Sequence, residues 1–139
     1  MTKRYLRDAS PAQDFIQHRS PTFERVFEIM RRPRVLVGVS YTTLAELRGG
    51  FEASASRERN LKSLRASFRW LKRWPFDLAS VQAYGEIYGT LHRLGRLIGH
   101  MDMQVAAVAL AMGSTTVVTY DKDLSTIPGL SVENWLKLP

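Results

Sequence analysis

The hydrophobic positions along the chain form two kinds of segment, continuous apolar runs and runs with helical spacing. The continuous runs at residues 34–40 and 115–120 are rich in β-branched residues, as is typical of strands buried on both faces. Shorter strands are expected at residues 5–7 and 132–135. Because these strands alternate with helical segments, the pattern predicts an α/β sandwich with a mainly parallel central sheet.

Helix start signals precede several of the helical segments. Ser10-Pro11 and Ser20-Pro21 each place an N-cap residue before a proline in the first turn. Thr43 and Glu46 match a capping box. The expected helices cover residues 11–18, 22–32, the stretch from 43 onward, 57–74, 78–94 and the segment from Asp102 to Gly113.

Length and composition limit the class of protein. The chain has 139 residues, 45% of them hydrophobic, which suits one compact domain. The absence of cysteine excludes disulfides and thiolate metal sites. The longest apolar run, residues 105–112, is far shorter than the roughly 20 residues of a membrane span, and the N-terminal stretch lacks the apolar core of a secretory signal. We therefore expect a cytoplasmic protein that is not bound to membranes.

The charge balance points to an anionic partner. Lysine and arginine number 20 against 13 aspartates and glutamates, which gives a net charge of +7. A basic surface attracts polyanions, so a nucleic acid or an acidic protein is the expected partner. Against this basic trend, carboxylates that gather at one place become informative.

Four carboxylates follow strands or open helices. Asp8 follows the first strand, Asp121 follows the strand at residues 115–120, and Glu46 and Asp102 lie near helix starts. Ligands of parallel sheets bind beyond the carboxyl ends of the strands, so we expect the four side chains to meet at that edge. Each also has a structural interpretation, because Glu46 could complete the capping box, Asp102 could be an N-cap, and Asp8 and Asp121 could form turns.

A cluster of like charges stays ionised only when something neutralises it. With no cysteine and three histidines in the chain, a divalent ion with oxygen ligands is the natural neutraliser, and carboxylates suit Mg²⁺ or Mn²⁺. An acidic metal site on a basic protein favours hydrolysis of phosphodiester bonds. We predict Asp8, Asp102 and Asp121 as metal ligands, with Glu46 as a fourth catalytic residue.

Six stretches of the chain carry a resemblance to a known family. They are YLRDASP, TLAELRGG, the run from Pro75 to Ile87, GRLIGHMDMQVAAVAL, VVTYDKDL and IPGLSVENW. In order and spacing they are similar to PIN-domain ribonucleases and, more narrowly, to the VapC toxins of bacterial toxin–antitoxin pairs. The resemblance implies that residues 1–139 form a single PIN-like nuclease domain, a three-layer α/β/α sandwich. It also implies an Mg²⁺- or Mn²⁺-dependent endoribonuclease that forms a homodimer and is inhibited by a small VapB-like antitoxin.

The family motifs fall on the same four carboxylates. Asp8 matches the first family aspartate, Glu46 the glutamate of the Ala-Glu-Leu motif, and Asp102 the aspartate after Ile-Gly-x-x. Asp121 falls where the family has Asn or Asp, although Asp123 could replace it.

The first motif departs from the family. Where the family has Leu-Asp-Thr-Asn, this chain has Arg7-Asp8-Ala9-Ser10, so the supporting amide is lost. The Ser10 hydroxyl could cap a helix or support the site, and Thr119 could add a second hydroxyl. The departure keeps open an alternative, a catalytically weak PIN-like module that binds RNA or a protein.

A phosphoacceptor receiver domain is set aside because the first strand ends in one aspartate instead of an acidic pair.

The predicted helix over residues 57–74 offers further candidates. A basic flank on it could contact RNA or the antitoxin, or could simply be solvated, and it comprises Lys62, Arg65, Arg69 and Lys72. Trp70 and Trp74 lie off the apolar stripe, which indicates either a protein interface or a second layer of core. His100 could serve a metal or act as a base, or be merely polar, and Asp14 is expected to face solvent.

Overall fold

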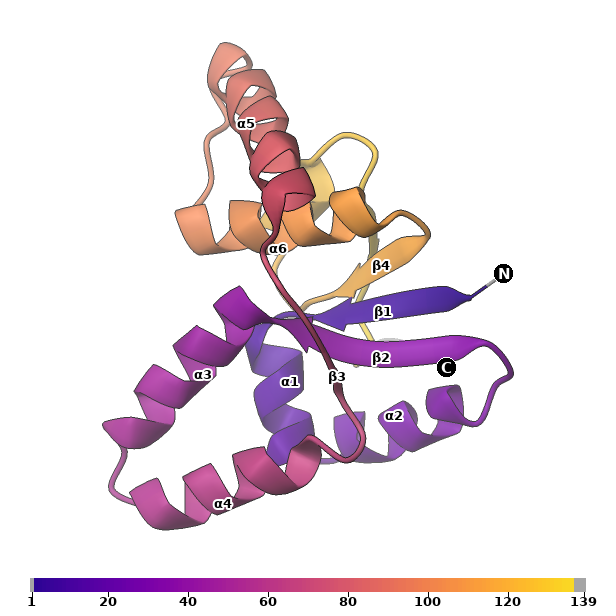
Figure 1. Ribbon diagram of the computed structural model, residues 1–139, viewed down its shortest axis with the longest axis vertical. Coiled ribbons are helices and arrows are strands. Elements are labelled where there is room, and N and C mark those ends of the chain that lie inside the picture. Colours follow the sequence, from indigo (N-terminus) through magenta and orange to yellow (C-terminus); the bar gives the residue numbers. More distant parts are fainter. Residues whose placement is uncertain (1, 137–139) are drawn as a thin grey trace.

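The computed structural model describes residues 2–136 and shows a parallel sheet between two layers of helices (Figure 1). The five strands lie in the order β3-β2-β1-β4-β5, and every neighbouring pair is parallel. The strands are β1 (Lys3–Arg7), β2 (Val35–Ser40), β3 (Lys72–Trp74), β4 (Thr115–Val118) and β5 (Ser131–Glu133). The helices are α1 (Ala9–Ile16), α2 (Thr22–Met30), α3 (Tyr41–Glu52), α4 (Arg57–Ser67), α5 (Leu78–Arg93), α6 (His100–Met112) and the short 3₁₀ turn η1 (Asp123–Thr126).

Each face of the sheet has its own hydrophobic core. Tyr5 and Val118 face the core that α1 to α4 cover, whereas their neighbours Leu6 and Val117 face the core under α5, α6 and η1. Successive side chains of a strand point to opposite faces, so a strand buried on both sides needs a continuous apolar run. The predicted three-layer α/β/α sandwich is thereby confirmed (Figure 1).

The predicted helix over residues 57–74 is wrong in its second half. Helix α4 ends at Ser67, the chain turns, and Lys72–Trp74 forms an edge strand that pairs with β2. The pairing depends on Gly38, where a Cβ atom would overlap the backbone carbonyl of Lys72 and lie 2.8 Å from the Trp74 ring. Since no side chain stands at residue 38, β3 approaches β2 closely enough to form its ladder.

Three predicted helix starts are also wrong, because α1, α3 and α6 each begin two residues before the predicted first residue. Helix α1 starts at Ala9 with Asp8 in the N-cap position, so Ser10 lies inside it. The hydroxyl of Ser40 accepts the Thr43 N–H at 3.1 Å and caps α3, which excludes the Thr43–Glu46 capping box. Helix α6 follows Gly99, and Asp102 lies in its first turn instead of capping it.

The Ser20 prediction fails in a similar way. Pro21 takes the N-cap position of α2, and the Ser20 hydroxyl donates to Glu24 at 2.6 Å.

Within residues 2–136, no helix has both the length and the apolar content to cross a membrane.

Candidate active site

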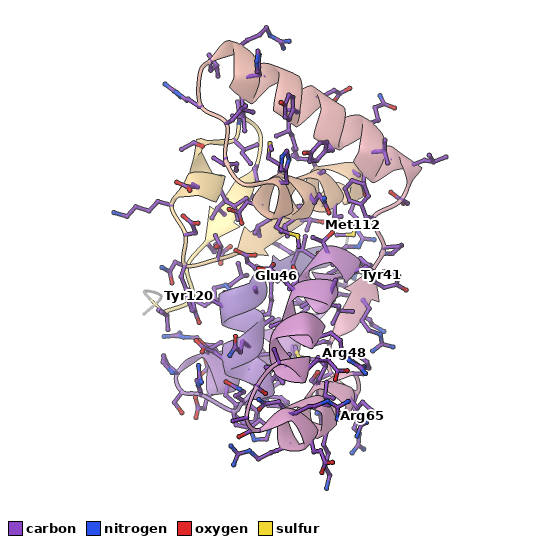
Figure 2. All side chains as sticks on the ribbon, turned by 90° about the vertical axis from the view of Figure 1, so that its left-hand side faces the viewer. Tyr41, Glu46, Arg48, Arg65, Met112 and Tyr120 are labelled. Atoms are coloured by element: carbon purple, nitrogen blue, oxygen red, sulfur yellow. The ribbon has the colours of Figure 1, made fainter. Side chains whose placement is uncertain are left out.

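The strand ends bring the predicted carboxylates to one edge of the sheet. The arrowheads of β1 and β2 point to the left in Figure 1, and Figure 2 looks at that side, where Glu46 lies near the centre. Asp8 follows β1 directly, Glu46 lies on the helix after β2, and Asp102 is in the first turn of α6. Asp121 and Asp123 come from the loop after β4. Segments far apart in sequence thus contribute to a single acidic cluster.

The tightest part of the cluster consists of three aspartates. Carboxylate oxygens of Asp102, Asp121 and Asp123 lie within 4.8 Å of one another. The backbone N–H of Asp123 donates to Asp121 at 2.9 Å, which turns the loop so that both side chains come to the same place. The sequence favoured Asp121 over Asp123 as a ligand, whereas the structure brings both of them to Asp102.

The electrostatics show that all five carboxylates interact. Partial burial raises the pKa of Asp102 to about 6, and the negative charges of Asp8, Asp121, Glu46 and Asp123 add to the rise. Partial burial and the neighbouring charge of Asp8 also raise the pKa of Glu46. The ion pairs found among residues 2–136 involve other acidic residues, so no lysine or arginine in this described part of the chain forms an ion pair with the cluster. The site therefore attracts cations.

Two threonine hydroxyls form hydrogen bonds in this region, one to members of the cluster and one between the helices that carry Glu46 and Asp102. The buried Thr119 hydroxyl donates to Asp8 at 3.0 Å and accepts the backbone N–H of Asp121 at 3.1 Å. The Thr42 hydroxyl donates to Gln104 at 2.9 Å and joins α3 to α6. Sequence reasoning included Thr119 but missed Thr42 and Gln104. Gln104 could have been noticed as the lone polar residue within the apolar stretch 103–109.

The remaining candidates lie elsewhere or make different contacts. Ser10 is exposed on α1, and its side chain forms no hydrogen bond within the part of the chain described. His100 accepts or donates a hydrogen bond at 2.7 Å with the Tyr84 hydroxyl, since either atom can carry the proton. Asp14 does not face solvent as expected, because its side chain is 20% exposed and accepts the Tyr120 hydroxyl at 2.7 Å.

The basic flank does not form one helix face. Lys62 and Arg65 are exposed on α4, but Arg69 lies in the turn after it and Lys72 lies in β3. Figure 2 shows Arg65 well below Glu46 on this side of the molecule. The two tryptophans differ as well. The Trp70 side chain is 47% exposed and packs edge-on against Phe27, whereas Trp74 is partly buried against the core under α5 and α6.

A buried arginine immediately precedes Asp8 in the chain. The Arg7 side chain is fully buried between the rings of Phe15 and Trp135, 5.7 and 5.4 Å from their centroids. It donates to the carbonyl of Pro11, but its Nε and Nη1 find no acceptor among the described residues. Burial lowers the pKa of Arg7 to about 9, while Tyr120 and Asp14 act in the opposite direction. This cation replaces the leucine expected from the family pattern.

Comparison with known proteins places this arrangement in a family. The PIN domain family profile matches residues 5–130. Ribonuclease VapC2 of Rickettsia felis is 33% identical over 101 residues, which cover 73% of this chain and 75% of the relative. The solved structure of VapBC2 from Rickettsia felis bound to a promoter DNA fragment contains a chain with a TM-score of 0.87 and 27% identity, covering 95% of this chain and 98% of that one.

A second solved structure is more distant in shape. It comes from VapBC-5 of Mycobacterium tuberculosis, a member of the VapBC family of toxin–antitoxin systems, with a TM-score of 0.68 and 27% identity, covering 94% of this chain and 96% of that one. The family profile spans residues 5–130, and the two solved chains match 95% and 94% of this chain. The chain belongs to the PIN domain family and, within it, to the VapC proteins.

Proposed function

We propose that this protein is an endoribonuclease that requires Mg²⁺ or Mn²⁺ and acts as the toxin of a toxin–antitoxin pair. The observation that supports this most is the convergence of five carboxylates at the carboxyl ends of the strands, with the pKa of Asp102 raised to about 6. A cluster of carboxylates with which no lysine or arginine of residues 2–136 forms an ion pair is suited to a divalent cation. The names of the VapC relatives support RNA as the substrate.

The donor set fits a hard divalent ion. Asp102, Asp121 and Asp123 each offer one oxygen within 4.8 Å of the other two, and Asp8 lies beside them at the end of β1. These are all-oxygen donors, as Mg²⁺ and Mn²⁺ prefer. When bound, such an ion supplies Lewis-acid activation of the phosphodiester and of water. Asp123 is the one donor of this set that the sequence ranked below its neighbour.

Glu46 is proposed to accept a proton, and the hydrogen-bonded residues around the cluster are proposed to hold it in place. Glu46 has a raised pKa and lies at the cluster's edge on α3, so its carboxylate is placed to accept a proton from the attacking water. The Thr119 hydroxyl holds Asp8 in one orientation, and the Thr42–Gln104 hydrogen bond holds α3 against α6. The net charge of +7 draws the polyanionic substrate to the surface around the acidic site.

The proposed partners follow from the same family. The similar solved chains come from VapBC structures, which supports a small VapB-like antitoxin as the inhibitor of this protein. The homodimer is proposed from the family resemblance alone. Trp70, 47% exposed on the α4 side, is a candidate anchor for one of these contacts.

Cleavage of RNA with and without metal tests the proposal. The purified protein should cut cellular RNA in Mg²⁺ or Mn²⁺, and excess EDTA should stop it. Asp102→Asn should lose the activity while its circular dichroism spectrum is unchanged, and Glu58→Gln, an exposed carboxylate on α4, serves as the matched control. Cleavage that continues in excess chelator contradicts the proposed metal dependence.

A second candidate function is a binding module with weak catalysis. Ala9 and Ser10 replace the family's Thr-Asn, and Ser10 makes no side-chain hydrogen bond to the cluster among the described residues. This candidate predicts RNA binding that does not depend on metal, no cleavage, and no growth arrest when the chain is expressed alone.

A further inference from the structure

A cleft of about 350 Å³ opens beside Glu46, enclosed by α1, α3 and α4. Its volume lies at the lower end of the range for small-ligand sites. Ala9, Leu47 and Phe51 supply apolar surface, and Glu46 is the one charged residue among those that line it. The cleft thus shares a wall with the acidic cluster but is otherwise neutral.

Three amide side chains form the polar wall of this cleft. Gln13 donates to Gln17 at 3.4 Å, Gln17 donates to Asn60 at 3.3 Å, and Asn60 donates to the Ser54 hydroxyl at 3.0 Å. Each amide carries two N–H donors and two acceptor lone pairs, so this chain of bonds leaves every amide with a donor and an acceptor in reserve. All three side chains are only partly buried, so these spare groups remain available to a ligand.

We propose that this cleft binds one unpaired base of the RNA substrate, next to the phosphodiester that is cut, and that Gln13, Gln17 and Asn60 read the edge of that base. The inference rests on the proposed nuclease function. Single-stranded RNA is recognised by bases that are splayed out, packed against flat apolar surface and hydrogen-bonded along their edges. Amide side chains match this task because they offer a donor beside an acceptor, as a base edge does.

The position of the cleft favours RNA over a protein segment. Because Glu46 belongs both to the cleft wall and to the acidic cluster, a strand that has its cleaved phosphate at the cluster and runs past Glu46 enters this cleft. A second hollow continues from Gln17 and Asn60 and adds Arg19 and Arg59. The order along the surface is therefore an acidic cluster, a base-sized cleft whose other lining residues are uncharged, and two arginines, of which Arg19 also pairs with Asp14 at 3.4 Å. This order matches phosphate, base and next phosphate.

Substitution of the central amide tests the proposal. Gln17→Leu removes the hydrogen-bonding groups at nearly constant size, and Gln82→Leu, an exposed glutamine on α5, is the matched control. Short single-stranded RNAs with randomised nucleotides are cleaved in Mn²⁺, and the product ends are sequenced. We expect Gln17→Leu to change the base preference at one position beside the cut by about tenfold or more, with Mn²⁺ affinity by calorimetry unchanged. Gln82→Leu should keep the wild-type preference.

A binding measurement keeps the test decisive if cleavage itself fails. Fluorescence anisotropy with short oligonucleotides of A, C, G and U compares the wild-type protein with Gln17→Leu and with Asn60→Ser. Loss of a wild-type base preference in both variants supports the cleft even when no RNA is cut, and that combination would refute only the nuclease function. The proposal is overturned if the wild-type protein has no base preference, if the variants keep it, or if they weaken only the binding of a VapB-like antitoxin.

Discussion

Thr119 donates a hydrogen bond of 3.0 Å to Oδ2 of Asp8, so the residue after β4 orients the carboxylate at the end of β1. The same hydroxyl accepts the backbone N–H of Asp121 at 3.1 Å. One buried hydroxyl therefore connects two members of the acidic cluster that come from neighbouring strands.

Replacing Thr119 by valine should reduce RNA cleavage by about tenfold while the fold is retained. Valine has the same branched shape, but it cannot donate to Asp8 or accept from Asp121. Steady-state cleavage rates in saturating Mn²⁺ check this. Thr116→Val is the control, because Thr116 is buried in β4, the strand that Thr119 follows, but its hydroxyl bonds Ser131. Equal rates for both variants would show that Thr119 does not position the cluster.

Asp102→Asn should stabilise the protein at neutral pH when no divalent ion is present. The folded-state pKa of about 6 lies above the ordinary value of 3.8, so the ionised side chain lowers stability increasingly as the pH rises from about 4 to 6. Because the group is partly exposed, the gain on neutralising it is about 1 kcal/mol after solvent screening. Thermal melts with EDTA should show a higher Tm for the variant at pH 7.5 and no difference near pH 4.

Divalent ions should reverse the order of the two Tm values, so that the wild-type protein becomes more stable than Asp102→Asn. Mn²⁺ should raise the Tm of the wild-type protein and leave Asp102→Asn nearly unchanged, since the ion binds the folded cluster. A wild-type Tm that does not respond to Mn²⁺ at pH 7.5 contradicts the assignment of Asp102 as a ligand.

Arg7→Met should leave the free energy of unfolding unchanged or raise it by up to about 2 kcal/mol. The Arg7 guanidinium is fully buried and two of its nitrogens have no acceptor among residues 2–136, whereas methionine fills similar space without that desolvation penalty. Urea denaturation measures the change. A loss above about 2 kcal/mol would mean that the stacking on Phe15 and Trp135 outweighs the burial of the charge.

Gly38→Ala should destabilise the protein by about 1–3 kcal/mol, because the new methyl group overlaps the Lys72 carbonyl and pushes β3 away from β2. Gly85→Ala is the opposite case, since its position on α5 is open and alanine favours a helix, so that variant should gain about 0.5–1 kcal/mol. Urea midpoints compare the two. A neutral Gly38→Ala would show that β3 can shift without cost.

The sequence predicted the parts of the fold that depend on local pattern. The runs of β2 and β4 were found because a strand buried on both faces has a nearly continuous series of apolar and β-branched residues. Asp8, Glu46, Asp102 and Asp121 converge as predicted, since parallel strands end at one edge whatever the details of the loops. Their catalytic roles remain predictions.

The features that sequence reasoning missed depend on contacts between distant segments. Lys72–Trp74 continues an amphipathic helical pattern and becomes a strand because β2 offers Gly38 as a pairing partner. Glu46 matched a capping box with Thr43, but the N-cap of α3 is Ser40, at the end of β2 and three residues before Thr43. Asp123 joins Asp102 only because the loop after β4 turns back on itself through the Asp121 side chain.

The central place of β1 has a consequence during synthesis. The first strand of the chain pairs with β2 on one side and with β4 on the other, and the donors from the loop after β4 come after residue 118. A ribosome must therefore make most of the 139 residues before the acidic cluster can assemble. Nascent chains cut short before this point would carry the first motif but no complete site, so the proposed toxicity would arise only after the loop that follows β4 has been made.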